Sequence, residues 1–354
     1  MTGKEKNIVL KVENLHTVFN TDSGAVEAVN GIDFAIEKGK TLGVVGESGS
    51  GKSVASLSIL QLLEGTTAKI TEGKILFKTT HSDDENWDED SNKDEEAIDL
   101  LKLSKSEMRK IRGHKIAMIF QEPMTSLNPT MTIGFQIAEP VMFHQGKSKA
   151  EAWKVAVKML ELVGMPEPEK RAKQFPFELS GGMRQRVMIA IALACRPEVL
   201  ICDEPTTALD VTVQAQILTL IKKLQRELGT SIIMITHDLG VIAETCDNVA
   251  VMYCGKVVEY TDAYSLFTNP QHPYTKGLLE SIPSHEVDSE EDLKTIEGTV
   301  PSPYDLPSGC MFAPRCPYAK DVCNEKLPEL TSSDGRSVRC LIHQTDLWKG
   351  EELW

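Results

Sequence analysis

The sequence lacks any hydrophobic run long enough to cross a membrane. A spanning helix needs about 18 or more consecutive apolar residues, and the best candidate, residues 187–195, is half that length and leads into Arg196-Pro197-Glu198. The opening residues, MTGKEKNIVLKVENL, also lack the apolar core of a signal peptide. We therefore expect a cytoplasmic chain that reaches a membrane only through partner proteins.

Positive charge is also scarce. The chain has 38 Lys and Arg against 52 Asp and Glu, a net charge of −14, which argues against a nucleic-acid partner because phosphates are bound mainly by Lys and Arg. Most of the imbalance is local, since residues 82–99 hold ten acidic residues and one lysine. Such a stretch has few apolar side chains to bury. We predict a solvated surface loop at about residues 79–100.

The CxxC pairs typical of structural zinc sites are absent, although the chain has eight cysteines. A cytoplasmic chain keeps its thiols reduced, so we expect no disulfides. The cysteines scattered through apolar segments are predicted to be core residues: Cys195, Cys202, Cys246 and Cys254. The other four cysteines crowd near the end: Cys310, Cys316, Cys323 and Cys340. Four thiolates suit tetrahedral Zn²⁺ or a [4Fe–4S] cluster. The spacing alone leaves three possibilities open for them, which are zinc, a cluster and no metal.

Strand and helix patterns alternate over most of the chain, which predicts an α/β fold with a mainly parallel sheet. Residues 7–45 alternate apolar and polar side chains between turn signals and are read as short strands. A mostly helical pattern, at about residues 123–196, is inserted between the buried strands. Pro, Gly and Ser become frequent toward the end, so we expect a separate appendage at residues 265–354.

A phosphate-binding loop is the clearest chemical signal. Residues 46–53 match GxxxxGK[ST], with a strand before and a helix after, as this motif requires. Its glycines let backbone N–H groups point at phosphate oxygens at the start of a helix. Lys52 would contact the β- and γ-phosphates and Ser53 would ligate Mg²⁺. The predicted nucleotide-binding residues here are Gly46, Glu47, Ser48, Gly49, Ser50, Gly51, Lys52 and Ser53.

An acidic strand end complements this loop. Residues 199–202 are apolar and deliver Asp203 and Glu204 to the carboxyl edge of the sheet, where α/β proteins bind ligands. We expect Asp203 to act on the metal ion through its water ligands. Glu204 is predicted to polarise an attacking water. Alone such a strand end is often structural, but with the phosphate loop it predicts a nucleoside-triphosphatase.

Residues 179–185, Leu-Ser-Gly-Gly-Met-Arg-Gln, narrow the class further. They resemble the signature of the ATP-binding-cassette ATPases, and the other family motifs follow in the family's order over residues 7–260. The resemblance implies a RecA-like P-loop NTPase core with an antiparallel β subdomain and an inserted helical subdomain, together spanning residues 1–264. It also implies that the signature caps the γ-phosphate held by a second subunit, through Ser180, Gly181, Gly182, Met183 and Gln185.

The same resemblance assigns roles to isolated residues. His237 would contact the γ-phosphate and hold the water with Glu204. Gln121 would touch Mg²⁺ or water and link the site to a transmembrane partner, and Asp210 would lie at the subunit interface. Phe19 is predicted to stack on adenine, although the family often has Tyr there and a core role for Phe19 stays open. The implied Mg²⁺ ligands, direct or through water, are Ser53, Gln121 and Asp203.

Other stretches resemble one branch of the family, the oligopeptide and dipeptide importers. Generic members carry Gln where this chain has Met183, and residues 119–129 and 205–216 also agree with the branch. Residues 269–279, Asn-Pro-Gln-His-Pro-Tyr-Thr-Lys-Gly-Leu-Leu, lie outside the ATPase core and support it independently. The resemblance implies a peripheral ATPase at the cytoplasmic membrane face, with a second, paralogous ATPase, two permease subunits and an extracytoplasmic peptide-binding protein.

The late cysteines fit this branch. Residues 309–317 resemble its C-terminal region, where such cysteines can hold a [4Fe–4S] cluster, so the resemblance implies a cluster at the four positions, with Zn²⁺ as the alternative. A nickel or other solute importer remains an alternative function, because this subunit does not touch the solute. A soluble cassette ATPase acting on DNA or ribosomes is disfavoured by the acidic charge. The presence of Glu204 and His237 argues against another alternative, a regulatory nucleotide-binding module that does not hydrolyse ATP.

Overall fold

The computed structural model describes residues 7–79, 97–121, 126–206, 210–282, 295–333, 335–351 and 353. These residues form two compact units, each assembled from three separate segments of the chain. The first unit comprises Met1–Lys11, Ala35–Thr41 and Ile75–Ile235, and the second comprises Val12–Phe34, Leu42–Lys74 and Thr236–Trp354. Most of the acidic stretch, residues 80–96, lies outside the described residues.

Three parallel strands form the centre of the first unit, in the order β8-β7-β6. The strands are β6 (Ile116–Ile119), β7 (Val199–Asp203) and β8 (Ser231–Ile235), and the residues of β7 and β8 are all buried. Ile201 of β7 pairs with Met118 and with Ile233. Continuous burial explains why β7 is apolar up to Asp203 and β8 is apolar after Ser231, as parallel strands covered on both faces are. The predicted α/β fold class is confirmed.

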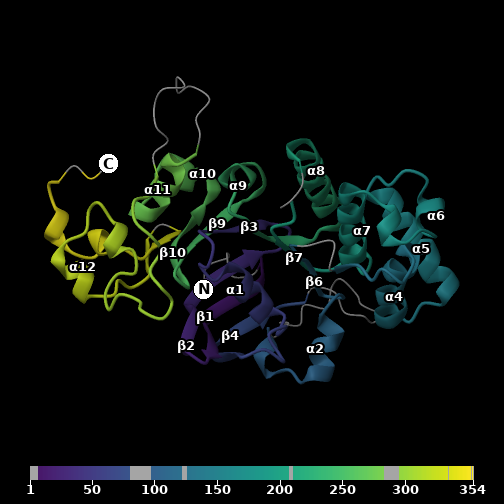
Figure 1. The fold of residues 1–354 in the computed structure, drawn as a ribbon, viewed down its shortest axis with the longest axis horizontal. Helices are drawn as coiled ribbons and strands as arrows, with labels where there is room; N and C mark the ends of the chain where they lie inside the picture. The colour runs from purple at the N-terminus through teal and green to yellow at the C-terminus, as the bar shows by residue number, and fades with distance from the viewer. Residues whose placement is uncertain are drawn as a thin grey trace. The chain divides into compact units, whose positions relative to one another are not determined.

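Helices fill the stretch between β6 and β7 and are drawn in teal in Figure 1. Helix α5 begins at a capping box in which Ser148 and Glu151 each satisfy a backbone N–H of the other, which stabilises a helix start. Helices α4, α5 and α7 pack on one another. The elements here are α4 (Ile133–Gln145), α5 (Lys149–Leu162), α6 (Pro168–Arg171), η3 (Pro176–Glu178) and α7 (Gly181–Leu193).

The second unit contains strands in the order β11-β12-β10-β9-β3. Strand β3 (Thr41–Val45) runs parallel to β9 (Asn248–Tyr253), and β10 (Lys256–Asp262) returns antiparallel to β9. The C-terminal region extends this sheet, because β12 (Arg336–Val338) pairs antiparallel with β10 and with β11 (Thr331–Ser333). The weak patterning of the region did not predict these two short strands.

The remaining strands form a sheet in the order β2-β1-β4-β5. A two-residue turn at 22–23 joins β1 (Ile8–Thr21) to β2 (Gly24–Glu37), so these neighbours run antiparallel. Strand β4 (Ala68–Phe77) is antiparallel to β5 (Ile98–Asp99). The other helices are α1 (Lys52–Ile59), η2 (Leu100–Lys102), α2 (Lys105–Ile111), α8 (Val211–Leu228), α9 (Leu239–Thr245), α10 (Ala263–Thr268), α11 (Pro273–Glu280), η4 (Ala313–Arg315), α12 (Asp321–Glu325), η5 (Leu341–His343) and η6 (Asp346–Trp348).

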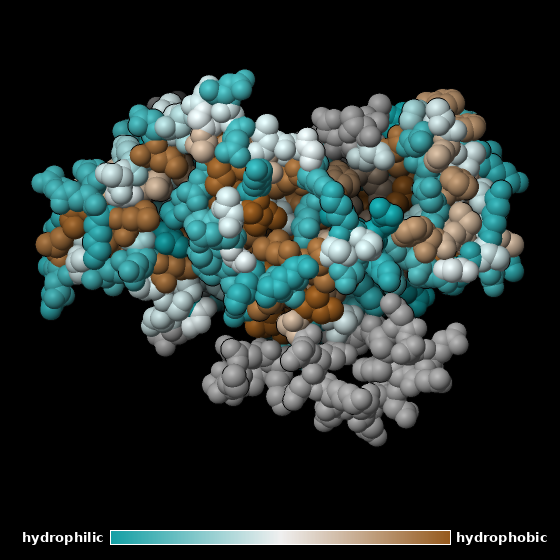
Figure 2. Space-filling model, turned by 90° about the horizontal axis from the view of Figure 1, so that it is seen from below, coloured by the Kyte–Doolittle hydropathy of each residue, from teal (hydrophilic) through white to brown (hydrophobic). Residues whose placement is uncertain are grey.

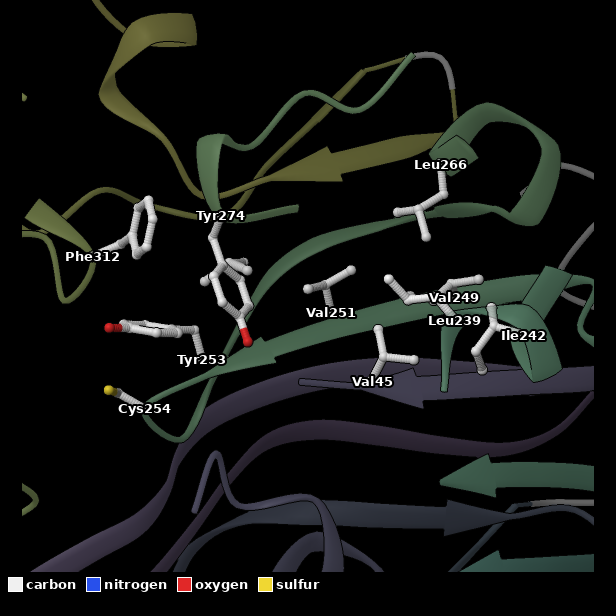
Figure 3. Packing of buried hydrophobic residues seen from close by; sticks show 11 residues of the cluster. Val45, Leu239, Ile242, Val249, Val251, Tyr253, Cys254, Leu266, Tyr274 and Phe312 are labelled. Carbon is white, nitrogen blue, oxygen red and sulfur yellow. The ribbon is translucent and has the colours of Figure 1, made fainter. Parts of the chain in front are cut away.

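One buried cluster joins the C-terminal region to the sheet of the second unit (Figure 3). Aliphatic side chains of β9 and α9 gather at one end, and three aromatic rings gather at the other. The rings of Tyr274 and Tyr253 lie 4.6 Å apart, and those of Tyr274 and Phe312 lie 5.4 Å apart. Aromatic pairs at these separations add to the stability gained by burial, so α11 is firmly anchored.

The predicted branch segment, residues 269–279, is held by a buried carboxylate. Glu259 of β10 is fully buried and accepts the backbone N–H groups of Gln271 and His272, each at 2.9 Å. His272 is also buried, and its Nδ1 accepts the Tyr274 N–H at the start of α11. Burial lowers the pKa of His272 to about 3, so the imidazole is neutral and able to act as this acceptor.

Among the described residues, no helix is both long and apolar enough to cross a membrane. On the face drawn in Figure 2, hydrophobic residues form several groups separated by hydrophilic ones.

The neutral state of His272 predicts a pH-dependent stability. The unfolded chain protonates this histidine below about pH 6.5, whereas the folded chain does so only near pH 3. Stability should therefore fall as the pH drops below 6.5, by up to about 1.4 kcal/mol per pH unit. Urea unfolding between pH 7 and 5 measures this. His272→Asn, which keeps an acceptor at the helix start and cannot titrate, should flatten the dependence, and His237→Gln, at an exposed position between β8 and α9, should not. Equal slopes in all three proteins would contradict the assignment.

Candidate functional site

The phosphate loop lies between β3 and α1 in the second unit, as predicted from its sequence. Glycine is required at two positions of this loop, because another backbone segment passes close to each of them. Gly46 and Gly51 have φ angles of 154° and 97°, and a Cβ there would lie 2.1 Å from the Met252 carbonyl oxygen and 2.3 Å from that of Ala28. Because neither backbone can yield as a flexible side chain would, only glycine fits at both positions.

Lys52, the predicted phosphate ligand, lies across this loop. Its side chain is buried, and Nζ donates to the carbonyl oxygens of Gly46 at 2.8 Å and Glu47 at 3.0 Å. Ser53 follows in the first turn of α1 and is half-buried, and Ser48 and Gly49 are exposed at the crest of the loop. A buried ammonium beside exposed backbone at a helix start is suited to bind an anion.

Asp203 and Glu204 lie at the end of β7 in the first unit, where the sequence analysis expects them. Asp203 is buried, and Glu204 has a left-handed backbone with φ of 46°. Non-glycine residues rarely adopt this conformation, and it is frequent at functional sites. The Glu204 N–H donates to the Ile235 carbonyl at 2.9 Å, and Gln121 donates its amide to the Glu204 carboxylate at 3.0 Å. The structure thus brings Gln121 and Glu204 together.

The signature residues form the start of α7. Ser180 is its N-cap, and the hydroxyl accepts the Met183 N–H at 3.4 Å. Gly181 is exposed, with open space where a Cβ would lie. Gln185 is buried one turn later and donates to the Pro205 carbonyl, which ties the helix to the segment after β7. The first turn therefore presents backbone N–H groups to solvent, as an anion-binding signature requires.

Three isolated candidates lie on different elements. Asp210 is the N-cap of α8 and accepts the Val213 N–H at 2.9 Å, while remaining exposed. His237 is exposed between β8 and α9, followed by Asp238, the N-cap of α9. Phe19 is half-buried in β1. Phe19, His237 and the phosphate loop belong to the second unit, and Gln121, Glu204, Asp210 and the signature belong to the first.

The four late cysteines gather around one small cavity of about 20 Å³. Burial raises the pKa of Cys340 to about 12 and that of Cys316 to about 11, so both are thiols unless a cation is bound. The donor set suits zinc or iron, and the cavity has room for one atom-sized body. Among the described residues, no three His, Cys, Asp or Glu side chains are arranged to hold a metal. The four predicted ligands therefore line one cavity, but their side chains are not arranged as metal ligands.

Three of the four scattered cysteines are buried, as expected of core residues. Cys195, Cys202 and Cys254 are buried, and Cys246 is half-buried against the cluster of Figure 3.

Comparison with known proteins decides the family. Residues 29–207 match the ABC transporter family model. The chain belongs to the ABC transporter family. Residues 258–323 match a second model, the oligopeptide/dipeptide transporter C-terminal region. The dipeptide transport ATP-binding protein DppD of Bacillus subtilis (strain 168) is 51% identical over 94% of each chain. The oligopeptide transport ATP-binding protein OppD of Salmonella typhimurium (strain LT2) is 49% identical over 94% of this chain and 93% of its own.

Solved structures agree with this membership. A dimeric structure of the ATP-binding cassette MJ0796, in a post-hydrolysis state bound to ADP and Pi, is 29% identical, with a TM-score of 0.59. The match covers 72% of this chain and 98% of that one. The fold of the ABC cassette is therefore shared, and this chain has additional residues beyond it.

Two contacts of the phosphate loop were missed by the sequence analysis of this ABC protein. The Glu47 N–H donates to the Tyr274 hydroxyl at 2.9 Å, and Arg315 donates to the Glu47 carboxylate. Tyr274 belongs to the branch segment, and Arg315 immediately precedes Cys316. Both stretches were noted as branch markers, but nothing in the sequence indicated that they reach the loop.

The different surroundings of two loop glycines predict different effects of alanine. Gly51→Ala would place a Cβ against the Ala28 carbonyl, whereas Gly49→Ala, with a similar φ of 80°, meets nothing within 4 Å. Backbone strain alone costs about 1–3 kcal/mol, so Gly49→Ala should keep measurable ATP binding. Gly51→Ala should weaken it at least about tenfold further, because the loop must also shift. Titration with a fluorescent ATP analogue measures both, and equal affinities would contradict the packing argument.

Proposed function

We propose that this chain is the ATP-hydrolysing subunit of an importer that carries dipeptides or oligopeptides across the cytoplasmic membrane. The match of residues 258–323 to the oligopeptide/dipeptide transporter C-terminal region carries the substrate class, because most of these residues lie outside the ATPase core. The near-50% identity to DppD and OppD over almost the whole chain supports the same choice.

We assign roles in hydrolysis from the chemistry of the side chains and, for Gln121 and His237, from the family resemblance. Lys52 stabilises charge on the β- and γ-phosphates, and Glu204 is the general base for the attacking water, oriented by Gln121. His237 contacts the γ-phosphate. Phe19 stacks on the adenine. Mg²⁺ prefers oxygen ligands and would be held, directly or through water, by Ser53, Gln121 and Asp203. When bound, it neutralises phosphate charge.

The exposed start of α7 supports a site completed by two subunits. Ser180, Gly181, Gly182 and Met183 form the surface that caps the nucleotide of a second ATPase, and Asp210 lies at that interface. Gln185, predicted to belong to this surface, is buried and instead holds α7 to the Pro205 carbonyl. The partner ATPase is a paralogue, and the pair acts on two permease subunits supplied with peptide by an extracytoplasmic binding protein. The subunit is peripheral at the cytoplasmic membrane face.

Two separate family matches, at residues 29–207 and 258–323, support a division of the chain into two domains. Residues 1–264 form the nucleotide-binding domain, with the helical subdomain at about 123–196, and residues 265–354 form the importer-type C-terminal domain.

Replacing the proposed base tests the hydrolytic mechanism. Glu204→Gln keeps the size of the side chain and its contact with Gln121, but it cannot accept a proton. Turnover should fall about a hundredfold or more, while the dissociation constant for ATP stays within about twofold. Phosphate release and equilibrium binding measure the two. Glu227→Gln, on the exposed surface of α8, is the matched control. Undiminished hydrolysis by Glu204→Gln would refute this assignment.

We propose that the four gathered thiols hold a [4Fe–4S] cluster, with Zn²⁺ as the alternative. A cluster of several atoms requires the cavity of about 20 Å³ to widen, whereas a single Zn²⁺ fits it as it stands. Cys310, Cys316, Cys323 and Cys340 would bind it as thiolates, fixing a region whose own core is small. Anaerobic purification should give a brown protein with a broad absorption near about 400 nm. Cys340→Ser should lose the colour and Cys195→Ser should keep it. A colourless protein with stoichiometric zinc would contradict the cluster.

A further inference from the structure

Glu47, the second residue of the phosphate loop, is held at three points. Its N–H donates to the Tyr274 hydroxyl at 2.9 Å, and its carbonyl accepts Lys52 Nζ at 3.0 Å. Its carboxylate accepts Arg315 Nη1 at 3.1 Å and 3.0 Å, one contact to each oxygen. Two of these three contacts come from the C-terminal region, and the third comes from the predicted phosphate ligand.

Arg315 is itself fixed in place. Its side chain is only 6% exposed, and Nε and Nη2 donate to the carbonyl oxygens of Glu297 at 3.1 Å and Ile296 at 3.3 Å. The guanidinium also lies 5.9 Å from the ring centre of Tyr253. A planar guanidinium with several directed donors loses little further freedom when it binds a carboxylate. Arg315 is therefore preorganised to hold Glu47.

Tyr274 is equally constrained. The side chain is fully buried in the aromatic end of the cluster, against Tyr253 and Phe312 (Figure 3). Its position follows from α11, whose start is held by His272 and Glu259. The hydroxyl is thus a rigid acceptor for the Glu47 N–H, and the loop entrance cannot move independently of the C-terminal region.

We propose that Arg315 is a positioning residue for the ATP site, through which the C-terminal region sets the affinity of the phosphate loop for nucleotide. A carboxylate at the entrance of a loop that binds triphosphate would repel it. Arg315 neutralises this charge and holds Glu47, whose carbonyl in turn positions Lys52. The inference rests on the proposed ATPase function and adds a residue from outside the ATPase core.

The test follows ATP binding and hydrolysis separately, with the full-length chain assembled with its partner subunits. Arg315→Met should raise the dissociation constant of a fluorescent ATP analogue and the KM for ATP by about tenfold, with kcat at saturating ATP within about twofold. In the double variant, Arg315→Met with Glu47→Gln, the dissociation constant should return to within about twofold of that of Glu47→Gln alone. The reason is that residue 47 then carries no charge for Arg315 to neutralise. Arg336→Met is the matched control, because Arg336 lies in the same region but bonds Asn269 and Thr261.

A second variant covers the case in which Arg315→Met does not fold. Tyr274→Phe removes only the hydroxyl that accepts the Glu47 N–H, and it should raise the dissociation constant about threefold. Wild-type nucleotide affinity in every folded variant, or a double variant that does not recover, would overturn the proposal. A wild-type complex that binds ATP without hydrolysing it would instead overturn the proposed function, and the binding titrations would still test Arg315.

Discussion

The phosphate loop passes so close to two other backbone segments that no side chain fits between them, and much of the second unit is arranged around this approach. Gly46 lies against the end of β9 at Met252, and Gly51 lies against β2 at Ala28. The Gly255 N–H donates to the Ser50 carbonyl and so ties the loop to the turn after β9, and the Asn30 N–H donates to the Gly255 carbonyl and so ties that turn to β2. The loop conformation is therefore set by its surroundings as well as by its own sequence.

The C-terminal region is built onto the same sheet that supports the loop. Strand β12 pairs with β10, and β10 also carries Glu259, the buried acceptor for the backbone before α11. A buried carboxylate without partners would be costly, so its two N–H donors account for its place in the core. This arrangement explains how a region outside the ATPase core supplies Tyr274 and Arg315 to the phosphate loop.

Glu204 shows a similar dependence on its surroundings in the first unit. Its left-handed backbone is unfavourable for a residue with a side chain, and the bond from its N–H to Ile235 of the neighbouring strand opposes that cost. The conformation turns the carboxylate toward Gln121 at the end of β6. Two parallel strands thus place Glu204 and Gln121 side by side at the carboxyl edge of the sheet, where α/β proteins bind ligands.

The sequence by itself determined the fold class, the phosphate loop, the acidic strand end and the signature helix, because each depends on residue type at short spacing along one element. Buried strands such as β7, and the strand and helix that flank residues 46–53, could be recognised for this reason. Tertiary structure alone decided that Arg315 and Tyr274 meet Glu47 and that β11 and β12 join the sheet. These contacts join residues up to 268 positions apart, and local patterns contain no information on which distant segments pack together.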